Sequence, residues 1–510
     1  MKKLIHLHLL AGLLAILTVG SVGHAQIMIE KTVTVGKNVP DGSGQLISAT
    51  TWLNSGIGTV SWVGSTLTFS SPFSNNPIVK SDLSGTLTFG STSESPVTTT
   101  VFSAGQLTSL TQQFTMADAF DAAWKSSGLW TLKIRDTKSG GVAALDTWKL
   151  VVEGTSSAAG TTMDLGNGIV RVASSGTSGT INANVNTGSS GNTATMEVAT
   201  DKTLNVMGIV SGAGRLVKNG AGTVAQYGVY NTYTGGTTIN EGTLAIRADG
   251  DLGAGPGSYD ANNIRLAGGT LLVSPSVTLN ANRGITLANG GGGISVDQNQ
   301  RLWVQSGITG SGTLTKTGTG ELKLVSGATA SVSTIAIQQG TLLLGAANQI
   351  SDSTSLTLSG GTLNTAGYAD QVGLLRVTGN STISGLVTSS GGAATGSDFL
   401  FSSVDLSTYS TSSGSTLTLS GIGYGQTVNI TTGSYTSWSS YSTTSLNNFQ
   451  NKISFGNSGL KAQINFNGTS GLTYVTAIPE PKVYVAMAML VVLVGAAEYR
   501  RRRSAKSAAV

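Results

Sequence analysis

Few residues of this chain have side chains that could carry out catalytic chemistry. All three histidines (His6, His8 and His24) lie within the first 25 residues, and the chain has no cysteine. Beyond residue 25 there is therefore no Ser-His-Asp or Cys-His mechanism, no histidine or thiolate zinc site and no disulfide. Carboxylates remain, and with Lys or Arg they can cleave polysaccharides. The candidate acids are scattered and form no repeated cluster: Asp201, Glu241, Asp249, Asp251, Glu321 and Asp352.

The N-terminus has the pattern of a secretory signal peptide over residues 1–25. Lys2 and Lys3 form a basic start, Leu9 to Val19 is apolar, and Gly23-His24-Ala25 is a cleavage site of small residues. We expect export by the Sec machinery and cleavage by signal peptidase after Ala25. The alternative, a first transmembrane helix, has an apolar run too short to span a membrane comfortably.

The charge of the chain is concentrated at its ends. Eight of the 29 Lys and Arg residues, but two of the 24 Asp and Glu residues, lie in residues 1–25 and 479–510. The remainder is close to neutral, so nothing indicates nucleic acid as a partner. With 70 Gly, 8 Pro and recurring Val, Ile, Leu and Thr, the composition favours β-structure over disorder or collagen.

Internal repeats occupy the middle of the chain. VSGAGRLVKNGAGTV (residues 210–224) recurs as ITGSGTLTKTGTGEL (residues 308–322) at an offset of 98, and LAGGTLLV (266–273) recurs as LSGGTLNT (358–365) at an offset of 92. Short alternating runs separated by glycines indicate strands and tight turns. Stacked similar units predict an all-β fold with a right-handed parallel β-helix or solenoid over residues 166–477. A phosphate-binding loop is the weaker interpretation of these glycines, because they lead into strands and not helices.

The repeat resembles the autotransporter-associated β-strand repeat. The first copy continues through NTYTGGTTINEGTLAI (231–246), whereas the second keeps the opening glycines and the later Gly-Thr-Leu but departs between them. Residues 446–468 resemble the end of such passenger regions. We expect only the C-terminal tail after Ile478, so the resemblance concerns the repeat and does not imply self-export.

Residues 27–153 have more aromatic residues and fewer repeats than the middle of the chain. In residues 127–154, Trp130, Leu132 and Ile134 would share one strand face, and Trp148, Leu150 and Val152 another. This predicts a β-sandwich, followed by a linker at residues 154–165.

The ending of this domain resembles the P domain (P/Homo B) of kexin-related proteases. The matching positions are Gly128, Trp130, Leu132, Ile134, Asp136, Trp148 and Leu150, with NVPDG (38–42) and DLSGTLTF (82–89) fitting more loosely. The resemblance implies a jelly roll without the protease domain, and calcium as the one conceivable cofactor. Its conceivable ligands are Asp41, Asp82 and Asp136; alternatively Asp136 caps a turn and the other two are solvated.

The C-terminal residues 478–510 have the pattern of a membrane anchor. Val483 to Ala497 is apolar and would rise about 22 Å as a helix, and Lys482, Glu498 and Tyr499 extend it towards a minimal membrane span. Arg500, Arg501, Arg502 and Arg503 follow as a positive-inside stop, with the bulk of the chain outside the cytoplasm.

Together with Pro479, Glu480 and Pro481, this tail resembles the PEP-CTERM sorting signal. The resemblance implies a precursor held transiently in the inner membrane and cut near the motif by an exosortase. The product would then reach the cell surface or medium of Gram-negative bacteria, often those making exopolysaccharide. The alternative is a plain anchor that is never cut.

These patterns predict a non-catalytic, exported structural or adhesive protein of the cell surface or matrix, with exopolysaccharide or surface glycans as partners. Two alternatives stay open: a polysaccharide-active β-helix enzyme that uses carboxylates, and a docking module linked to proteolysis through its P-like domain. Aromatic residues that could contact a partner are Trp52, Trp62, Tyr435, Trp438 and Tyr441.

Overall fold

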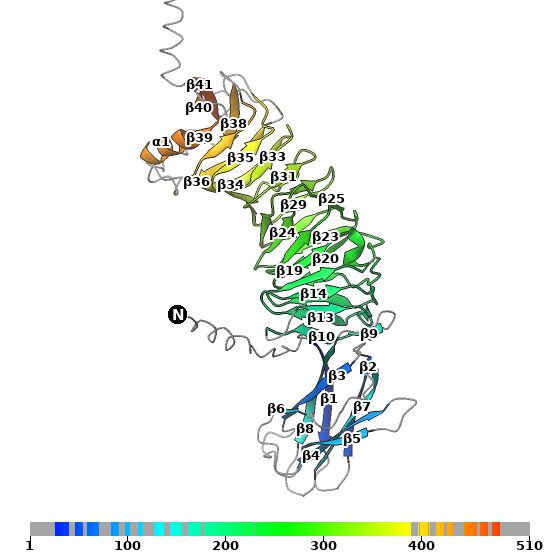
Figure 1. Cartoon of the computed structure of the whole chain (residues 1–510). Helices are drawn as coiled ribbons and strands as arrows, with labels where there is room; N and C mark the ends of the chain where they lie inside the picture. The colour runs from blue at the N-terminus through cyan, green and yellow to red at the C-terminus, as the bar shows by residue number, and fades with distance from the viewer. Residues whose placement is uncertain are drawn as a thin grey trace, which may run out of the picture. The chain divides into compact units, whose positions relative to one another are not determined.

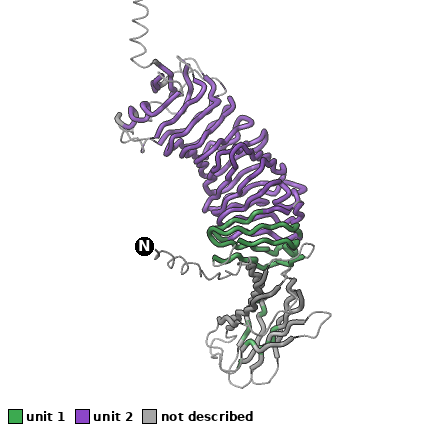
Figure 2. The backbone as a smooth tube through the Cα atoms, in the orientation of Figure 1, with its two compact units in different colours: residues 1–211, 220–225 green, residues 212–219, 226–510 purple. Residues whose placement is uncertain are grey.

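The structure is a computed structural model of the 510-residue chain. It describes residues 26–39, 46–54, 59–70, 83–90, 97–102, 111–115, 127–136, 143–155, 162–174, 178–228, 230–388, 396, 398–405, 407, 415–422, 426–431, 443–455, 460–467 and 472–479. The expected signal peptide and all of the expected sorting tail beyond Pro479 lie outside these residues. The chain divides into two compact units, residues 1–211 with 220–225 and residues 212–219 with 226–510 (Figure 2).

The first unit begins with two sets of antiparallel strands. One has the order β1 (Gln26–Val39), β8 (Ala143–Thr155), β3 (Thr59–Ser70) and β6 (Thr111–Thr115). The other has the order β2 (Leu46–Asn54), β7 (Ser127–Asp136), β4 (Leu83–Gly90) and β5 (Val97–Phe102). Leu132, Ile134, Trp148 and Leu150 are fully buried, which confirms the inward faces predicted for these four residues.

The same unit contains the first coils of a parallel β-solenoid. Parallel pairs join β10 (Gly168–Val172) to β13 (Thr193–Val198), and β11 (Gly179–Ile181) to β14 (Thr203–Val206). β9 (Thr162–Asp164), β12 (Asn184–Asn186) and β15 (Val210–Ser211) form a third sheet, so solenoid pairing begins inside the segment expected to be a linker. β1 pairs antiparallel with β10, and this covers the backbone edge of the first coil.

The parallel strands of the second unit belong to three sheets, which we call faces 1, 2 and 3. Figure 1 shows the successive coils that these strands form. Face 1 consists of β16 (Arg215–Asn219), β18 (Thr237–Ile239), β20 (Asp260–Leu266), β23 (Arg283–Leu287), β26 (Ile308–Gly310) and β29 (Ala330–Ser331). Face 2 contains β19 (Thr243–Ile246), β21 (Thr270–Val273), β24 (Gly292–Val296), β27 (Thr313–Thr317), β30 (Thr334–Ile337), β32 (Ser355–Ser359), β34 (Asp370–Gly379), β36 (Phe399–Asp405) and β38 (Thr427–Thr431). Face 3 contains β22 (Val277–Thr278), β25 (Arg301–Val304), β28 (Glu321–Leu324), β31 (Thr341–Leu344), β33 (Thr362–Asn364), β35 (Ser381–Ser384), β37 (Leu417–Leu419) and β39 (Ile453–Ser454).

In strands such as β27, β28, β30, β31 and β32, buried side chains alternate with more exposed ones, and the buried ones stack on their counterparts in the next coil. On face 3, Leu302, Leu322, Leu342 and Leu363 are in register, and each is at most 1% exposed. Burying one such side chain contributes roughly 1.5–3 kcal/mol. The apolar stack therefore stabilises the solenoid and fixes the register, because a slip of one residue would turn every leucine outward.

Face 2 is followed by two antiparallel strands, and a helix directly precedes the last strand of face 3. β38 pairs with β41 (Leu472–Pro479), which pairs with β40 (Leu460–Asn467). The helix α1 (Thr443–Lys452) carries the fully buried Phe449 and was not expected from the sequence. No helix within the described ranges is long and apolar enough to cross a membrane; the apolar run expected to do so, Val483 to Ala497, is not among them.

The two copies of the 98-residue repeat form the same strands but on different faces. β16 lies on face 1 and β27, its counterpart, on face 2; β19 lies on face 2 and β31, its counterpart, on face 3. The predicted solenoid is present, but these two copies of the repeat do not lie directly above one another in it. The repeat encodes a strand–corner–strand unit, and its two copies form different corners of the solenoid.

Gly340 belongs to one of these corners, and we predict that Gly340→Ala destabilises the protein by about 2–4 kcal/mol. Gly340 has φ +65°, and an added Cβ would stand 2.3 Å from the Gly320 carbonyl oxygen and 2.4 Å from that of Gly318. Urea unfolding followed by circular dichroism measures the loss. Gly257→Ala is the matched control, because an added Cβ there meets nothing within 4 Å; equal midpoints for the two variants would contradict the corner argument.

Candidate functional site

The repeated lysines are buried at corners and bind the main chain. Lys316 is fully buried, and its Nζ donates to the carbonyl oxygens of Thr317 at 2.6 Å, Gly318 at 2.8 Å and Gln339 at 3.3 Å. Lys218 is 1% exposed and donates to Asn219 at 2.8 Å and Glu241 at 3.2 Å. Each ammonium thus ties its own corner to the following coil, which explains why the repeat combines Lys with glycines.

Two of the six candidate acids hold one turn in place. Asp249 lies in the 3-10 helix η2 (Asp249–Leu252), and its carboxylate binds the buried Arg283 through Nε at 2.9 Å and Nη2 at 3.1 Å. Asp251 in the same turn accepts hydrogen bonds from the amides of Arg247 and Ala248, while burial raises the pKa of its carboxyl. Arg283 also donates to the Leu252 and Gly253 carbonyls.

The other candidate acids do not join this turn. Glu321 pairs with Arg301 at 3.2 Å on face 3, the side chain of Glu241 is exposed, and Asp201 occupies a turn with φ +60°. Asp352 lies on another coil, between β31 and β32. Within the described ranges no three Asp, Glu, His or Cys side chains are grouped so that they could hold a metal ion.

The residues predicted to bind calcium or partners are placed only in part. Asp136 ends β7 and pairs with Leu83, while Asp41 and Asp82 lie outside the described residues. Trp52 lies opposite Leu129 in β2, and Trp62 lies opposite Glu153 in β3; the structure describes neither side chain. Tyr435, Trp438 and Tyr441 also fall outside it. Both sets of residues stay predictions.

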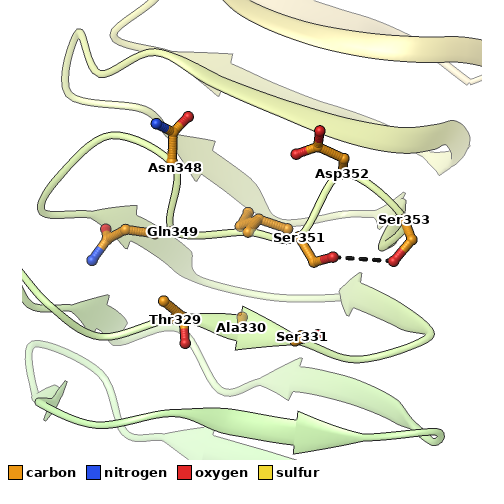
Figure 3. A pocket seen from close by; sticks show the side chains of 9 residues that line it. Thr329, Ala330, Ser331, Asn348, Gln349, Ser351, Asp352 and Ser353 are labelled. Atoms are coloured by element: carbon orange, nitrogen blue, oxygen red, sulfur yellow. Dashed lines mark hydrogen bonds between the residues drawn. The ribbon is translucent and has the colours of Figure 1, made fainter.

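An open polar depression, not foreseen from the sequence, lies where face 1 ends (Figure 3). It has a volume of about 580 Å³ and lies between β29 and the next segment of chain, which is joined to β29 by a bridge from Ala330 to Ile350. We call its nine lining residues the polar depression: Thr329, Ala330, Ser331, Asn348, Gln349, Ile350, Ser351, Asp352 and Ser353.

Two buried polar side chains fix the backbone of the polar depression. Gln349 accepts hydrogen bonds from the amides of Gly345 and Ala346 and donates to the carbonyls of Val325 and Ala328. Asp370 Oδ2 accepts from the amides of Gln349 and Ile350, both at 2.9 Å. Burial raises the pKa of the Asp370 carboxyl, and these amides oppose that rise. The exposed groups therefore stand on a fixed frame.

The exposed groups of the polar depression offer both donors and acceptors. Thr329, Ser331, Asn348, Asp352 and Ser353 are exposed, and the hydroxyls of Ser351 and Ser353 lie 3.0 Å apart within hydrogen-bonding distance (Figure 3). Asp352 supplies the one ionisable side chain of the lining. Such a surface can exchange hydrogen bonds with a hydroxyl-rich ligand. Of these residues the sequence had singled out Asp352 alone, and no local motif marks the others.

Comparison with known proteins bears on the repeat. A family model described as the passenger-associated-transport-repeat matches residues 216–246, the segment that contains Lys218, β18 and β19. The chain is also similar to the Adhesin BmaC autotransporter of Brucella suis biovar 1 (strain 1330), at 34% identity over 125 residues. This stretch is 24% of the chain and 3% of that relative, so the chain spans a small part of the relative's length. The repeat predicted from the sequence is confirmed.

Burial of Lys316 predicts a particular pH dependence of stability. Burial lowers the pKa of its ammonium to about 8, whereas an unfolded lysine titrates near pH 10.4. Between these values the unfolded chain binds more protons, so the contribution of Lys316 to stability rises with pH and is least below pH 8. From pH 8 to 10 the unfolding free energy of the native protein should rise by roughly 1–3 kcal/mol relative to Lys316→Met.

Urea titrations at several pH values measure this difference. Lys323→Met on β28, the next strand along the chain, is the control for removal of a lysine. A constant offset between native protein and Lys316→Met across this range would contradict the predicted linkage.

Proposed function

We propose that the chain is an exported surface protein with an adhesive, structural role, in which the solenoid is the scaffold. The match of residues 216–246 to the passenger-associated-transport-repeat carries the proposal. The similarity to a protein named as an adhesin supports it over 125 residues. A parallel solenoid suits this role because its stacked strands hold a regular, extended set of outward side chains on a rigid frame.

The proposed role requires no catalysis by this chain. In the described part of the structure, the candidate acids Asp249 and Asp251 are engaged by Arg283 and by backbone amides, and Glu321 by Arg301. These contacts stabilise turns and neighbouring strands. A polysaccharide-cleaving enzyme would need free carboxylates in one groove. The contacts of these three carboxylates support a structural role instead.

Sorting through the C-terminal tail is part of the proposal. The sequence Pro479-Glu480-Pro481, the apolar run and Arg500 to Arg503 support recognition by an exosortase and passage through the inner membrane. The P/Homo B resemblance of residues 27–153 supports a jelly roll that docks or spaces the solenoid. Exopolysaccharide of the producing cell is the partner that this route of sorting suggests.

The sorting proposal is tested by the C-terminal peptide of the mature protein. We expect mass spectrometry of fractionated native cells and medium to find a chain that ends near Pro479 and lacks the four arginines. Simultaneous Pro479→Ala, Glu480→Ala and Pro481→Ala should leave the full tail in the inner membrane, because the recognition sequence is gone. Lys506→Ala, outside the motif, should be processed normally; an intact tail in the native protein would contradict sorting.

A further inference from the structure

We propose that the polar depression and the ring of Tyr259 together form a binding site for neutral, hydroxyl-rich saccharides. The inference names the ligand class for the proposed adhesive role and rests on that role. All of its residues belong to the second unit. Tyr259, Thr329 and Asn348 lie before the paired positions of face 1, whereas Ser331 lies in β29 and Asp352 follows the bridge from Ala330 to Ile350.

Tyr259 lies on the same corner as the polar depression. The tyrosine precedes β20 directly, and it is 53% exposed. A Cβ added at Gly307 would stand 3.0 Å from the Tyr259 Oη and 3.8 Å from the Oγ1 of Thr329, which lines the polar depression. The phenol of Tyr259 therefore extends along the corner towards Thr329. It passes Gly307, which has no side chain to obstruct it.

Register places Gly307, Thr329 and Gln349 in one column along this corner. Ile285 of β23 pairs with Ile308 of β26, which pairs with Ala330 of β29, and Ala330 bridges to Ile350. The residues just before these positions thus succeed one another along the corner, from Gly307 to Thr329 to Gln349. The Oη of Tyr259 lies beside Gly307 of this column, and the partly exposed ring of this tyrosine offers a flat apolar surface on which the C–H face of a sugar ring can stack.

The chemistry of the lining favours a saccharide without charge. Asn348 offers a donor and an acceptor, Asp352 accepts, and the Thr329, Ser331 and Ser353 hydroxyls do both. Vicinal sugar hydroxyls need this combination. Asp352 is the one charged member of the lining, so a phosphate or uronate would face a carboxylate with no cation from these nine residues.

The edge of face 1 is poorly suited to an added peptide strand. Strand addition uses free backbone amides at a sheet edge. Here the amides of Gln349 and Ile350 already donate to Asp370, and the amide of Asn348 donates to the Ala369 carbonyl. With these three amides engaged, the exposed side-chain hydroxyls, the Asn348 side-chain amide and the Asp352 carboxylate are the groups that can bind a saccharide.

The test is binding of the purified full chain to an array of neutral and acidic oligosaccharides and extended peptides. Calorimetry with the strongest neutral binder then compares the native protein with Tyr259→Ala and Asp352→Ala. We expect each substitution to weaken binding about tenfold, through a lost stacking surface or acceptor. Tyr230→Ala is the matched control, since this tyrosine is 79% exposed on a different coil. Circular dichroism and urea midpoints establish that the variants are folded.

Three outcomes would overturn the inference, and a fourth would contradict the proposed function instead. If the protein binds no saccharide of the array, the proposed ligand is wrong. If native cells nevertheless carry the chain on their surface and adhere through it, the proposed function still holds. Tight saccharide binding that both substitutions leave unchanged would exclude this site. A preference for acidic oligosaccharides or peptides would exclude the ligand class. Binding that depends on Tyr259, by a chain absent from the cell surface, would support the site and contradict the proposed function.

Discussion

The backbone hydrogen bonds between successive coils are the interaction on which the rest of the structure depends. A coil made of strands of two to ten residues cannot bury its inward side chains alone, so the apolar stack exists only while coils stay paired in register. The corners have to bring backbone segments very close together to allow this. Two residues allow this close approach. Gly340 has no Cβ that would collide with neighbouring carbonyl oxygens, and the buried ammonium of Lys316 donates to three carbonyl oxygens.

The same constraint governs where pairing stops, because an unpaired edge can recruit other chains. In the first unit, β1 covers β10 by antiparallel pairing. In the second unit, β41 and β40 continue face 2 in antiparallel fashion. Face 1 ends differently: the carboxylate of Asp370 takes the place of a strand by accepting two backbone amides. This ending engages two amides at the edge of face 1, and Gln349 and Ile350, which supply them, line the polar depression proposed to bind saccharides.

Much of the solenoid could be predicted from local sequence. The alternation in GTLTK and ELKLV correctly indicates strands with Leu314, Leu322 and Leu324 turned inward, since strand side chains alternate with a period of two. The repeat was likewise recognisable, because its glycines and lysine recur at fixed spacing. The faces used by each copy were not predictable. They depend on the lengths of the intervening coils, including the turn held by Asp249 and Arg283, 34 residues apart.

The candidate site could not be predicted from the sequence either, because its residues are far apart along the chain. Asp370 lies 21 residues from Gln349, and Tyr259 lies two coils from Gly307 in the order of face 1, so no local pattern joins them. The central claim, an adhesive scaffold at the cell surface, is tested most directly by labelling intact cells of the native host with antibodies against the solenoid. The account predicts labelling of intact cells, which protease treatment of the cell exterior abolishes. Labelling that appears only after the cells are permeabilised would contradict it.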